Sequence, residues 1–296
     1  MILYPNCKIN LGLNIVGKRC DGYHDIETVF LPIPLVDCLE LVPASEDTFT
    51  IDGHKLDCSV GDNLVVRVLD MLRAEDIDVP PVSVRLTKRI PSGAGLGGGS
   101  TDAAFMMKGL NELFSLGLTE QQMISFVSGI GADCPVFIAN NPVYAEGKGD
   151  VFTPLDVPLL QKHYFALPPV GGSIPPVIQL NMISALDGYW LVLVKPNDFI
   201  STREAYGAVR PHPSTVNLKD LLAQPVKTWR GCMQNAFEES VFPKHPTVRN
   251  ICEQLYMLGA SYAAMSGSGS TVYGLFRQKP TLGEVFANHF QWQCQL

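Results

Sequence analysis

The sequence predicts an α+β protein of two domains, and three observations lead to this expectation. The chain has 296 residues, which is more than one hydrophobic core usually serves. Segments of alternating apolar and polar residues predict strands, and they dominate the first half. Segments with capping residues and an apolar face predict helices between them. We place the domain boundary after Thr153, which gives domains 1–153 and 154–296.

The composition excludes several classes of protein. Hydrophobic residues make up 46% of the chain and charged residues 17%, which predicts a compact globular protein and not a disordered one. A net charge of -7 argues against broad binding to nucleic acid or an anionic membrane, because clustered Lys and Arg drive such binding. The N-terminal residues do not match the pattern of a secretory or import signal, so we expect neither secretion nor organellar import. No apolar run approaches the ~20 residues needed to span a bilayer. Because the eight cysteines are scattered, as in reduced proteins, we expect a cytoplasmic location.

Several strands and helices can be predicted individually. Lys8–Val16, Thr48–Ile51 and Val82–Leu86 alternate, so we expect half-buried antiparallel strands. Asp62 and Asn63 can cap a helix, and Thr119–Gln122 fits a capping box of a second helix that Gly131 would end. Farther along, the sequence predicts a buried strand at Trp190–Val194, a second strand at Val272–Phe276 and a helix at Val248–Leu258. Prolines between 150 and 190 argue against long regular elements, and we interpret 159–186 as an insertion.

A glycine-rich segment precedes the helical stripe that begins near Ala103. Its residues are Pro91, Ser92, Gly93, Ala94, Gly95, Leu96, Gly97, Gly98, Gly99, Ser100 and Thr101. Ser100 or Thr101 is the expected helix cap. Glycines that let a ligand reach the backbone, followed by the free N–H groups of a helix start, predict an anion site suited to phosphate. The lysine of the usual P-loop is absent, so other groups must balance the phosphate charge.

The glycine segment allows three other interpretations. A flexible linker would not need to run into a helix start. Gly93, Gly95 and Gly98 match the dinucleotide pattern G-x-G-x-x-G, which leaves an NAD-dependent oxidoreductase as a rival. The strand before the loop alternates and is charged, however, unlike a Rossmann strand. A regulatory module that binds a nucleotide without catalysis stays open until catalytic groups are found.

Two residues outside the loop are candidates for such groups. Lys8 lies at the start of a predicted strand, and Asp133 precedes a proline in Gly131–Phe137. Taken alone, Lys8 is better interpreted as a solvated strand lysine, and Asp133 is equally well a helix N-cap. Neither residue alone establishes catalysis.

Three stretches in order resemble the GHMP superfamily of small-molecule kinases, named for galactokinase, homoserine kinase, mevalonate kinase and phosphomevalonate kinase. They are Pro5–Asn10, Pro91–Thr101 and Ser266–Ser270, and the resemblance covers most of the chain. It implies an N-terminal domain like the second domain of ribosomal protein S5, a ferredoxin-like C-terminal domain, and a site between them.

The resemblance narrows to members that act on a cytidine-diphosphate-linked methylerythritol. Gly17–His24, Gly97–Gly99, Gly131–Phe137 and Met265–Gly269 carry it. It implies ATP-dependent phosphorylation of the C2 hydroxyl, in the non-mevalonate route to isoprenoid precursors. The expected ligands are that substrate, ATP and the Mg²⁺ carried with ATP. We assign no metal-binding residue, nucleic acid or membrane partner, and expect a monomer or weak homodimer.

The same resemblance implies the roles of individual residues. Lys8 and Asp133 would be catalytic, and Asn63 and Lys88 would join the glycine segment in contacting ATP, at its base and ribose. Asn10, Tyr23 and His24 would hold the cytidine substrate. A tyrosine ring can stack on a pyrimidine, and a histidine can contact its polar edge, although Asp21–His24 by itself predicts only a turn.

The phosphate charge would then be balanced by several groups. They are the backbone N–H groups of the loop, the helix dipole, Mg²⁺ with Ser100 or Thr101 nearest to it, and Lys8 at the transferring end. The carboxylate of Asp102 would repel phosphate, so we expect its side chain to turn away.

Overall fold

The computed structural model describes residues 1–54, 56, 59–169, 175–207, 209–212 and 216–296. The chain forms two compact units, each built from separate segments. Unit 1 comprises Met1–Lys8, Ile33–Ser92 and Gly97–Asn141, and unit 2 comprises Ile9–Pro32, Gly93–Leu96 and Pro142–Leu296. The last passage between units follows Asn141, so the units do not coincide with the predicted boundary after Thr153, which stays a prediction.

Unit 1 contains a four-stranded sheet in the order β1 (Ile2–Leu3), β4 (Cys38–Pro43), β6 (Val82–Lys88) and β5 (Thr48–Gly53). Buried and more exposed side chains alternate along β6, as predicted. β6 pairs antiparallel with β4 but parallel with β5, so the expectation of an antiparallel strand at Thr48–Ile51 is wrong. The chain passes from β5 to β6 through a helix, and such a crossover lets two neighbouring strands run in the same direction.

The helices of unit 1 are α1 (Leu64–Ala74), α2 (Gly98–Leu113), α3 (Glu120–Ser128) and α4 (Val136–Ala139). Asn63 caps α1, where its side chain accepts the Val65 N–H at 2.9 Å. Thr119 and Gln122 form the predicted capping box of α3. The prediction that Gly131 ends α3 is wrong, because the helix stops at Ser128 and hydrogen bonds of 3.0–3.1 Å tighten its last turn at Gly129 and Ile130.

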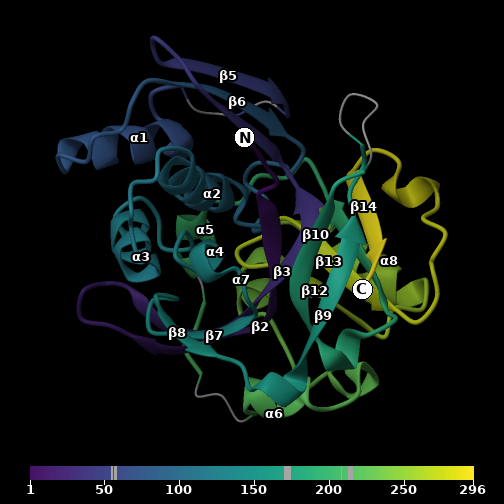
Figure 1. Ribbon diagram of the computed structural model, residues 1–296. Coiled ribbons are helices and arrows are strands. Elements are labelled where there is room, and N and C mark those ends of the chain that lie inside the picture. Colours follow the sequence, from purple (N-terminus) through teal and green to yellow (C-terminus); the bar gives the residue numbers. More distant parts are fainter. Residues whose placement is uncertain (55, 57–58, 170–174, 208, 213–215) are drawn as a thin grey trace. The chain divides into compact units, whose positions relative to one another are not determined.

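The core of unit 1 lies between this sheet and its helices. α1 and α2 run side by side (Figure 1), and their apolar faces pack with the sheet. Buried members of this core include Leu41, Val84, Leu86, Val68, Leu69, Leu72, Met107 and Leu110. This packing fixes α2, whose first turn continues the glycine segment.

A second sheet has the order β2 (Asn6–Lys18), β3 (His24–Val36), β7 (Val143–Glu146) and β8 (Val151–Pro154). β7 pairs antiparallel with both β3 and β8. β2 and β3 contribute residues to both units. Every residue of β2 from Asn6 to Leu13 is buried, so the prediction of a half-buried strand is wrong there. Both faces of that stretch are covered, which places the polar side chains of Lys8 and Asn10 in the interior.

Unit 2 contains an antiparallel sheet in the order β12 (Tyr262–Met265), β13 (Val272–Phe276), β11 (Trp190–Lys195) and β14 (Phe290–Gln295). β11, β13 and α8 (Pro246–Met257) confirm three predicted elements. α5 (Thr202–Gly207) and α7 (Phe237–Val241) also contribute to the core, and α6 is Leu218–Leu222. The buried residues of the unit 2 core include Val192, Val194, Ala205, Phe237, Ile251, Leu255 and Val272.

The proline-rich segment is more regular than predicted. β9 (Leu160–Ala166) and β10 (Val177–Ile183) form an antiparallel pair whose register runs from Leu160↔Ile183 to Ala166↔Val177. Its prolines flank these strands and therefore do not interrupt the ladder. Short 3₁₀ helices lie at η1 (Val157–Leu159), η2 (Ser184–Leu186), η3 (Val226–Thr228) and η4 (Glu284–Phe286). None of the helices in the described part of the chain has the length and apolar character needed to span a bilayer.

Candidate active site

The glycine segment leads into the start of α2, which begins earlier than predicted. Gly97, not Ser100 or Thr101, is the N-cap, with a left-handed φ of 71°. The first helical hydrogen bond runs from the Thr101 N–H to the Gly97 carbonyl at 2.9 Å. The N–H groups of the first turn have no acceptor within the helix, and they lie at the positive end of its dipole. The start of α2 therefore has the features of an anion site.

Gly97 lies beside Lys8 and Phe137. A Cβ built on Gly97 would stand 3.0 Å from the Phe137 ring and 3.3 Å from Lys8 Cε. A side chain at this position would be strained by the backbone and crowded by both neighbours. The lack of a side chain at Gly97 therefore leaves room for Lys8 next to the start of α2.

Lys8 and Asp133 form an ion pair within unit 1. Lys8 Nζ lies 3.5 Å from Asp133 Oδ2, and the exposed fractions of the two side chains are 4% and 36%. Lys8 is therefore buried, and the interpretation of it as a solvated strand lysine is wrong. Asp133 is not a helix cap either, because α4 starts at Val136 after Pro135. Unit 1 therefore brings together a buried ammonium group, a partly exposed carboxylate and the start of α2.

Lys88 and Asp102 lie in the interior of unit 1. Lys88 donates to the carboxylates of Asp37 and Asp102, and all three side chains are at most 3% exposed. This position does not support the predicted contact between Lys88 and the nucleotide. The expectation that Asp102 turns away from a phosphate ligand agrees with its burial against Lys88.

Asn63 lies near the start of α2 but is already used as a cap. Its side-chain oxygen accepts the Val65 N–H, and the residue is 7% exposed. The next residue, Leu64, has its Cδ1 atom 3.7 Å from a Cβ built on Gly99. A contact of Asn63 with the base of ATP stays a prediction.

In unit 2, the middle of the glycine segment is hydrogen-bonded to the second glycine-rich motif. The Ser266 hydroxyl donates to the Gly95 carbonyl at 3.0 Å and accepts the Asn10 N–H at 3.2 Å. The Thr271 N–H donates to the Ala94 carbonyl at 3.3 Å. A Cβ on Gly95 would stand 2.0 Å from the Ser266 carbonyl oxygen, so only glycine fits there. The sequence motifs at Asn10, Gly95 and Ser266 thus meet in one network.

The predicted substrate residues Tyr23 and His24 lie at the turn between β2 and β3. The Arg19 N–H donates to the Tyr23 carbonyl at 2.8 Å and the Tyr23 N–H to Asp21 Oδ1 at 3.0 Å, which confirms the predicted turn. The Tyr23 ring is 61% exposed, with Lys148 Nζ 5.0 Å from its centroid. His24 stacks on Tyr206, with ring centroids 5.0 Å apart. The turn presents one exposed aromatic ring and one stacked one.

The third substrate candidate, Asn10, is 3% exposed. Its side-chain NH₂ donates to the Thr28 hydroxyl at 3.0 Å, and its Oδ1 lies 3.2 Å from a Cβ built on Gly267. Asn10 therefore connects β2, β3 and the second glycine-rich motif.

Comparisons with known proteins show the family to which the chain is similar. Two family models, the GHMP kinases N terminal domain and the GHMP kinases C terminal, match residues 63–141 and 217–290. A 4-diphosphocytidyl-2-C-methyl-D-erythritol kinase of Bacteroides fragilis is 45% identical over 302 residues, covering 100% of both chains. The chain belongs to the GHMP kinase family. Its resemblance to these kinases in sequence motifs is thereby confirmed.

Further relatives of this GHMP kinase support the same placement. A 4-diphosphocytidyl-2-C-methyl-D-erythritol kinase of Parabacteroides distasonis is 44% identical over 299 residues, with 100% of both chains covered. The crystal structure of a 4-(cytidine 5'-diphospho)-2C-methyl-D-erythritol kinase has a TM-score of 0.74 at 28% identity, covering 99% of this chain and 98% of its own. Methanococcus jannaschii mevalonate kinase, at 12% identity and a TM-score of 0.61 over 100% and 98% of the two chains, shares the fold.

Sequence reasoning missed Asn235 and Glu238 of this GHMP kinase. Asn235 donates to the carbonyls of Met265 and Gly267 at 2.7 and 2.8 Å, and Glu238 accepts the Met265 N–H at 2.7 Å. Both residues therefore hold the backbone around Ser266. The local sequence Gln234–Glu238 matches no motif that would predict a contact with Met265 or Gly267.

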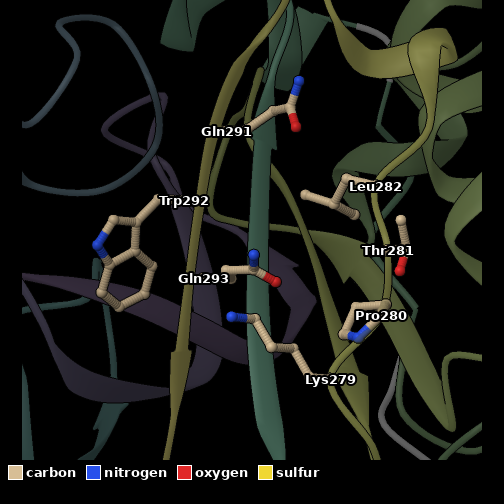
Figure 2. A pocket seen from close by; sticks show the side chains of 7 residues that line it. All are labelled: Lys279, Pro280, Thr281, Leu282, Gln291, Trp292 and Gln293. Carbon is tan, nitrogen blue, oxygen red and sulfur yellow. The ribbon is translucent and has the colours of Figure 1, made fainter.

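A separate groove of about 620 Å³ lies at the C-terminal end of the GHMP kinase chain. Figure 2 shows Pro280, Thr281 and Leu282 on one side and Gln291 and Gln293 of β14 on the other. None of the predicted site residues lines this groove, so we do not assign the reaction to it.

Proposed function

We propose that this chain transfers the γ-phosphoryl group of ATP to the C2 hydroxyl of 4-diphosphocytidyl-2-C-methyl-D-erythritol, forming ADP and the 2-phosphate. The reaction belongs to the non-mevalonate route to isoprenoid precursors. The observation that carries the proposal is the Lys8–Asp133 pair beside the start of α2, in a chain similar over its full length to kinases of this name. The paired residues would supply the catalytic groups that a regulatory module lacks.

The start of α2 would bind the ATP phosphates. Its unpaired N–H groups and dipole favour negative charge, and Gly97, Gly98 and Gly99 let the phosphates reach the backbone. Bound Mg²⁺ would supply additional positive charge between the phosphate oxygens. Of the two hydroxyls predicted near it, Ser100 fits better, because its residue is partly exposed whereas Thr101 is fully buried.

Asp133 would act as the general base. Phosphoryl transfer needs mainly an acceptor in line and balanced charge, since its transition state is loose. As the C2 oxygen bonds to phosphorus, its proton would pass to Asp133, and the electron pair of the breaking P–O bond would go to ADP. Lys8 would pair with the carboxylate and stabilise the charge on the transferring group.

The β2–β3 turn would bind the cytidine end of the acceptor. Tyr23 is exposed enough for its ring to stack on a pyrimidine, and His24 is held in place by Tyr206. Asn10 would act nearer the second glycine-rich motif, with which it shares hydrogen bonds. These roles are consistent with the site residues that sequence resemblance implied.

The test is a coupled assay for ADP release by the purified protein with MgATP. We expect turnover with 4-diphosphocytidyl-2-C-methyl-D-erythritol and little with mevalonate, homoserine or galactose. Turnover of mevalonate at an equal rate would contradict the acceptor while leaving a GHMP kinase. Micromolar binding of NAD, measured by calorimetry, would revive the oxidoreductase alternative.

We also propose that the enzyme works in the cytoplasm as a monomer or weak homodimer. In support of the cytoplasmic location, the seven cysteines within the described residues are free thiols. Sedimentation at several protein concentrations would test the oligomeric state.

A further inference from the structure

Three charged side chains meet in the interior of unit 1. Asp37 follows β3, Lys88 ends β6, and Asp102 lies in α2 just after its first turn. Their exposed fractions are 0%, 3% and 2%. Lys88 Nζ donates to Asp37 Oδ2 and, at 2.5 Å, to Asp102 Oδ2. We call these residues the buried triad.

The buried triad holds both ends of the glycine segment. Asp37 Oδ1 accepts the N–H groups of Arg89 and Ile90, at 2.5 and 2.8 Å, directly before Pro91. Asp102 lies directly after Thr101, where the segment has become helix. The Lys88 ammonium group donates to both carboxyl groups. It therefore links the N-terminal end of the glycine segment to its C-terminal end.

Asp37 also connects the buried triad to the strand that carries Lys8. Its backbone N–H donates to the Pro5 carbonyl at 2.9 Å, just before β2 begins. One residue thus fixes the backbone before the glycine segment and the backbone before the catalytic lysine.

We infer that Asp37, Lys88 and Asp102 are positioning residues that set the spacing of the two ends of the glycine segment for binding of the ATP phosphates. The inference rests on the proposed kinase function. It gives Lys88 a role through the loop backbone in place of a direct contact with the nucleotide.

In the buried triad, one cationic side chain faces two acidic ones, and substitutions can test how much this pairing contributes. Burial raises the pKa of the Asp102 carboxyl well above its usual range, opposed by Lys88 and aided by the Asp37 charge. Burial acts to lower the pKa of Lys88, but the charges of Asp102 and Asp37 raise it overall. Removing Lys88 would leave two acidic groups facing each other without a cation.

The experiment compares Lys88→Met, Asp102→Asn and the double variant, with ATP affinity measured by calorimetry and Tm by thermal unfolding. Lys88→Met should weaken ATP binding by about tenfold or more, because the ends of the segment lose their shared partner. The double variant should recover most of that loss, since an amide at position 102 donates to Asp37 and removes the second acidic group. The KM of the acceptor should change much less than that of ATP.

Asp47→Asn is the matched control. Asp47 lies in the same unit and likewise accepts hydrogen bonds from a cationic side chain and from the backbone. Its donors are the Arg73 guanidinium group and the Val82 N–H, the latter at 2.9 Å. It lies away from the glycine segment in sequence and is not part of the proposed site. We expect this variant to lower Tm and to bind ATP as the unmodified protein does.

Two results would overturn the inference. If Asp102→Asn gives no recovery in the Lys88→Met background, Lys88 acts directly on the nucleotide. If the variants lose Tm but keep the ATP affinity of the Asp47→Asn control, the buried triad serves stability alone. Should Lys88→Met fail to fold, Asp102→Ala should weaken ATP binding more than Asp102→Asn does, and equal affinities would contradict the inference. ATP binding is read without an acceptor, so a wrong acceptor in the proposed function would leave this test intact.

Discussion

Lys8 Nζ lies 3.5 Å from Asp133 Oδ2, and the lysine is buried while the aspartate is partly exposed. The exposed side of Asp133 leaves its carboxylate reachable for an acceptor, with the Lys8 ammonium group beside it. The pair therefore has the charge and the access that a general base requires.

Asp133→Asn should lower kcat by about 10²- to 10⁴-fold, the usual contribution of a positioned general base. ATP affinity should change little, because in the proposed mechanism Asp133 contacts the proton of the acceptor and not ATP. Lys8→Met should cause comparable damage, and the double variant should be less impaired than the product of the two effects, since both residues serve one step. Steady-state kinetics measures all three. An Asp133→Asn protein with near-normal kcat and a lowered Tm would show that the aspartate is only structural.

Gly97→Val should weaken ATP binding. Valine is β-branched and would have to adopt the left-handed backbone conformation of Gly97. Its side chain would also clash with Phe137 and the Lys8 side chain. Calorimetry with ATP measures the loss. Gly117→Val offers a control, because this glycine is also left-handed and its added Cβ would meet nothing within 4 Å. If both variants lose stability to the same extent and bind ATP equally, crowding at Gly97 does not matter for the nucleotide.

Tyr23→Ala should raise the KM for the acceptor by about 5- to 100-fold, as expected when stacking worth ~1–3 kcal/mol on a base is lost. The KM for ATP and the Tm should stay close to their original values, because the ring is 61% exposed. Tyr23→Phe keeps the ring and should behave almost as the unmodified protein. An unchanged acceptor KM in Tyr23→Ala would reduce the β2–β3 turn to a purely structural element.

Glu238 should make stability depend on pH. Burial raises its pKa to about 7, and the hydrogen bond from the Met265 N–H opposes this shift. Between its ordinary value of 4.5 and about 7, the folded protein keeps a proton that the unfolded chain has lost. The free energy of unfolding should therefore fall as pH rises through this window and level off above it.

Glu238→Gln should remove this dependence, since the amide oxygen can still accept the Met265 N–H. Compared at pH 8 and pH 4.5, the variant should gain up to about 3 kcal/mol in unfolding free energy relative to the unmodified protein. Urea unfolding at the two pH values measures the difference. Parallel pH profiles of the two proteins would contradict the raised pKa.

Features that depend on residues close together in the chain could be predicted from the sequence alone. The cap at Asn63, the capping box at Thr119 and Gln122, the alternation of β6 and the turn before His24 all follow from local hydrogen bonds or side-chain periodicity. The motifs at Asn10, Gly95 and Ser266 pointed to the family because each has a backbone or polar requirement that few residues meet.

Contacts between residues far apart in the chain depend on the packed fold and could not be predicted locally. Nothing local to Lys8 predicts Asp133, and nothing local to Lys88 predicts that Asp37 and Asp102 enclose its ammonium group. The parallel pairing of β5 with β6 and the burial of both faces of β2 likewise depend on what packs around them. The physical reason is that a side chain's charge state and partners follow from its burial, and burial is a property of the whole packed core.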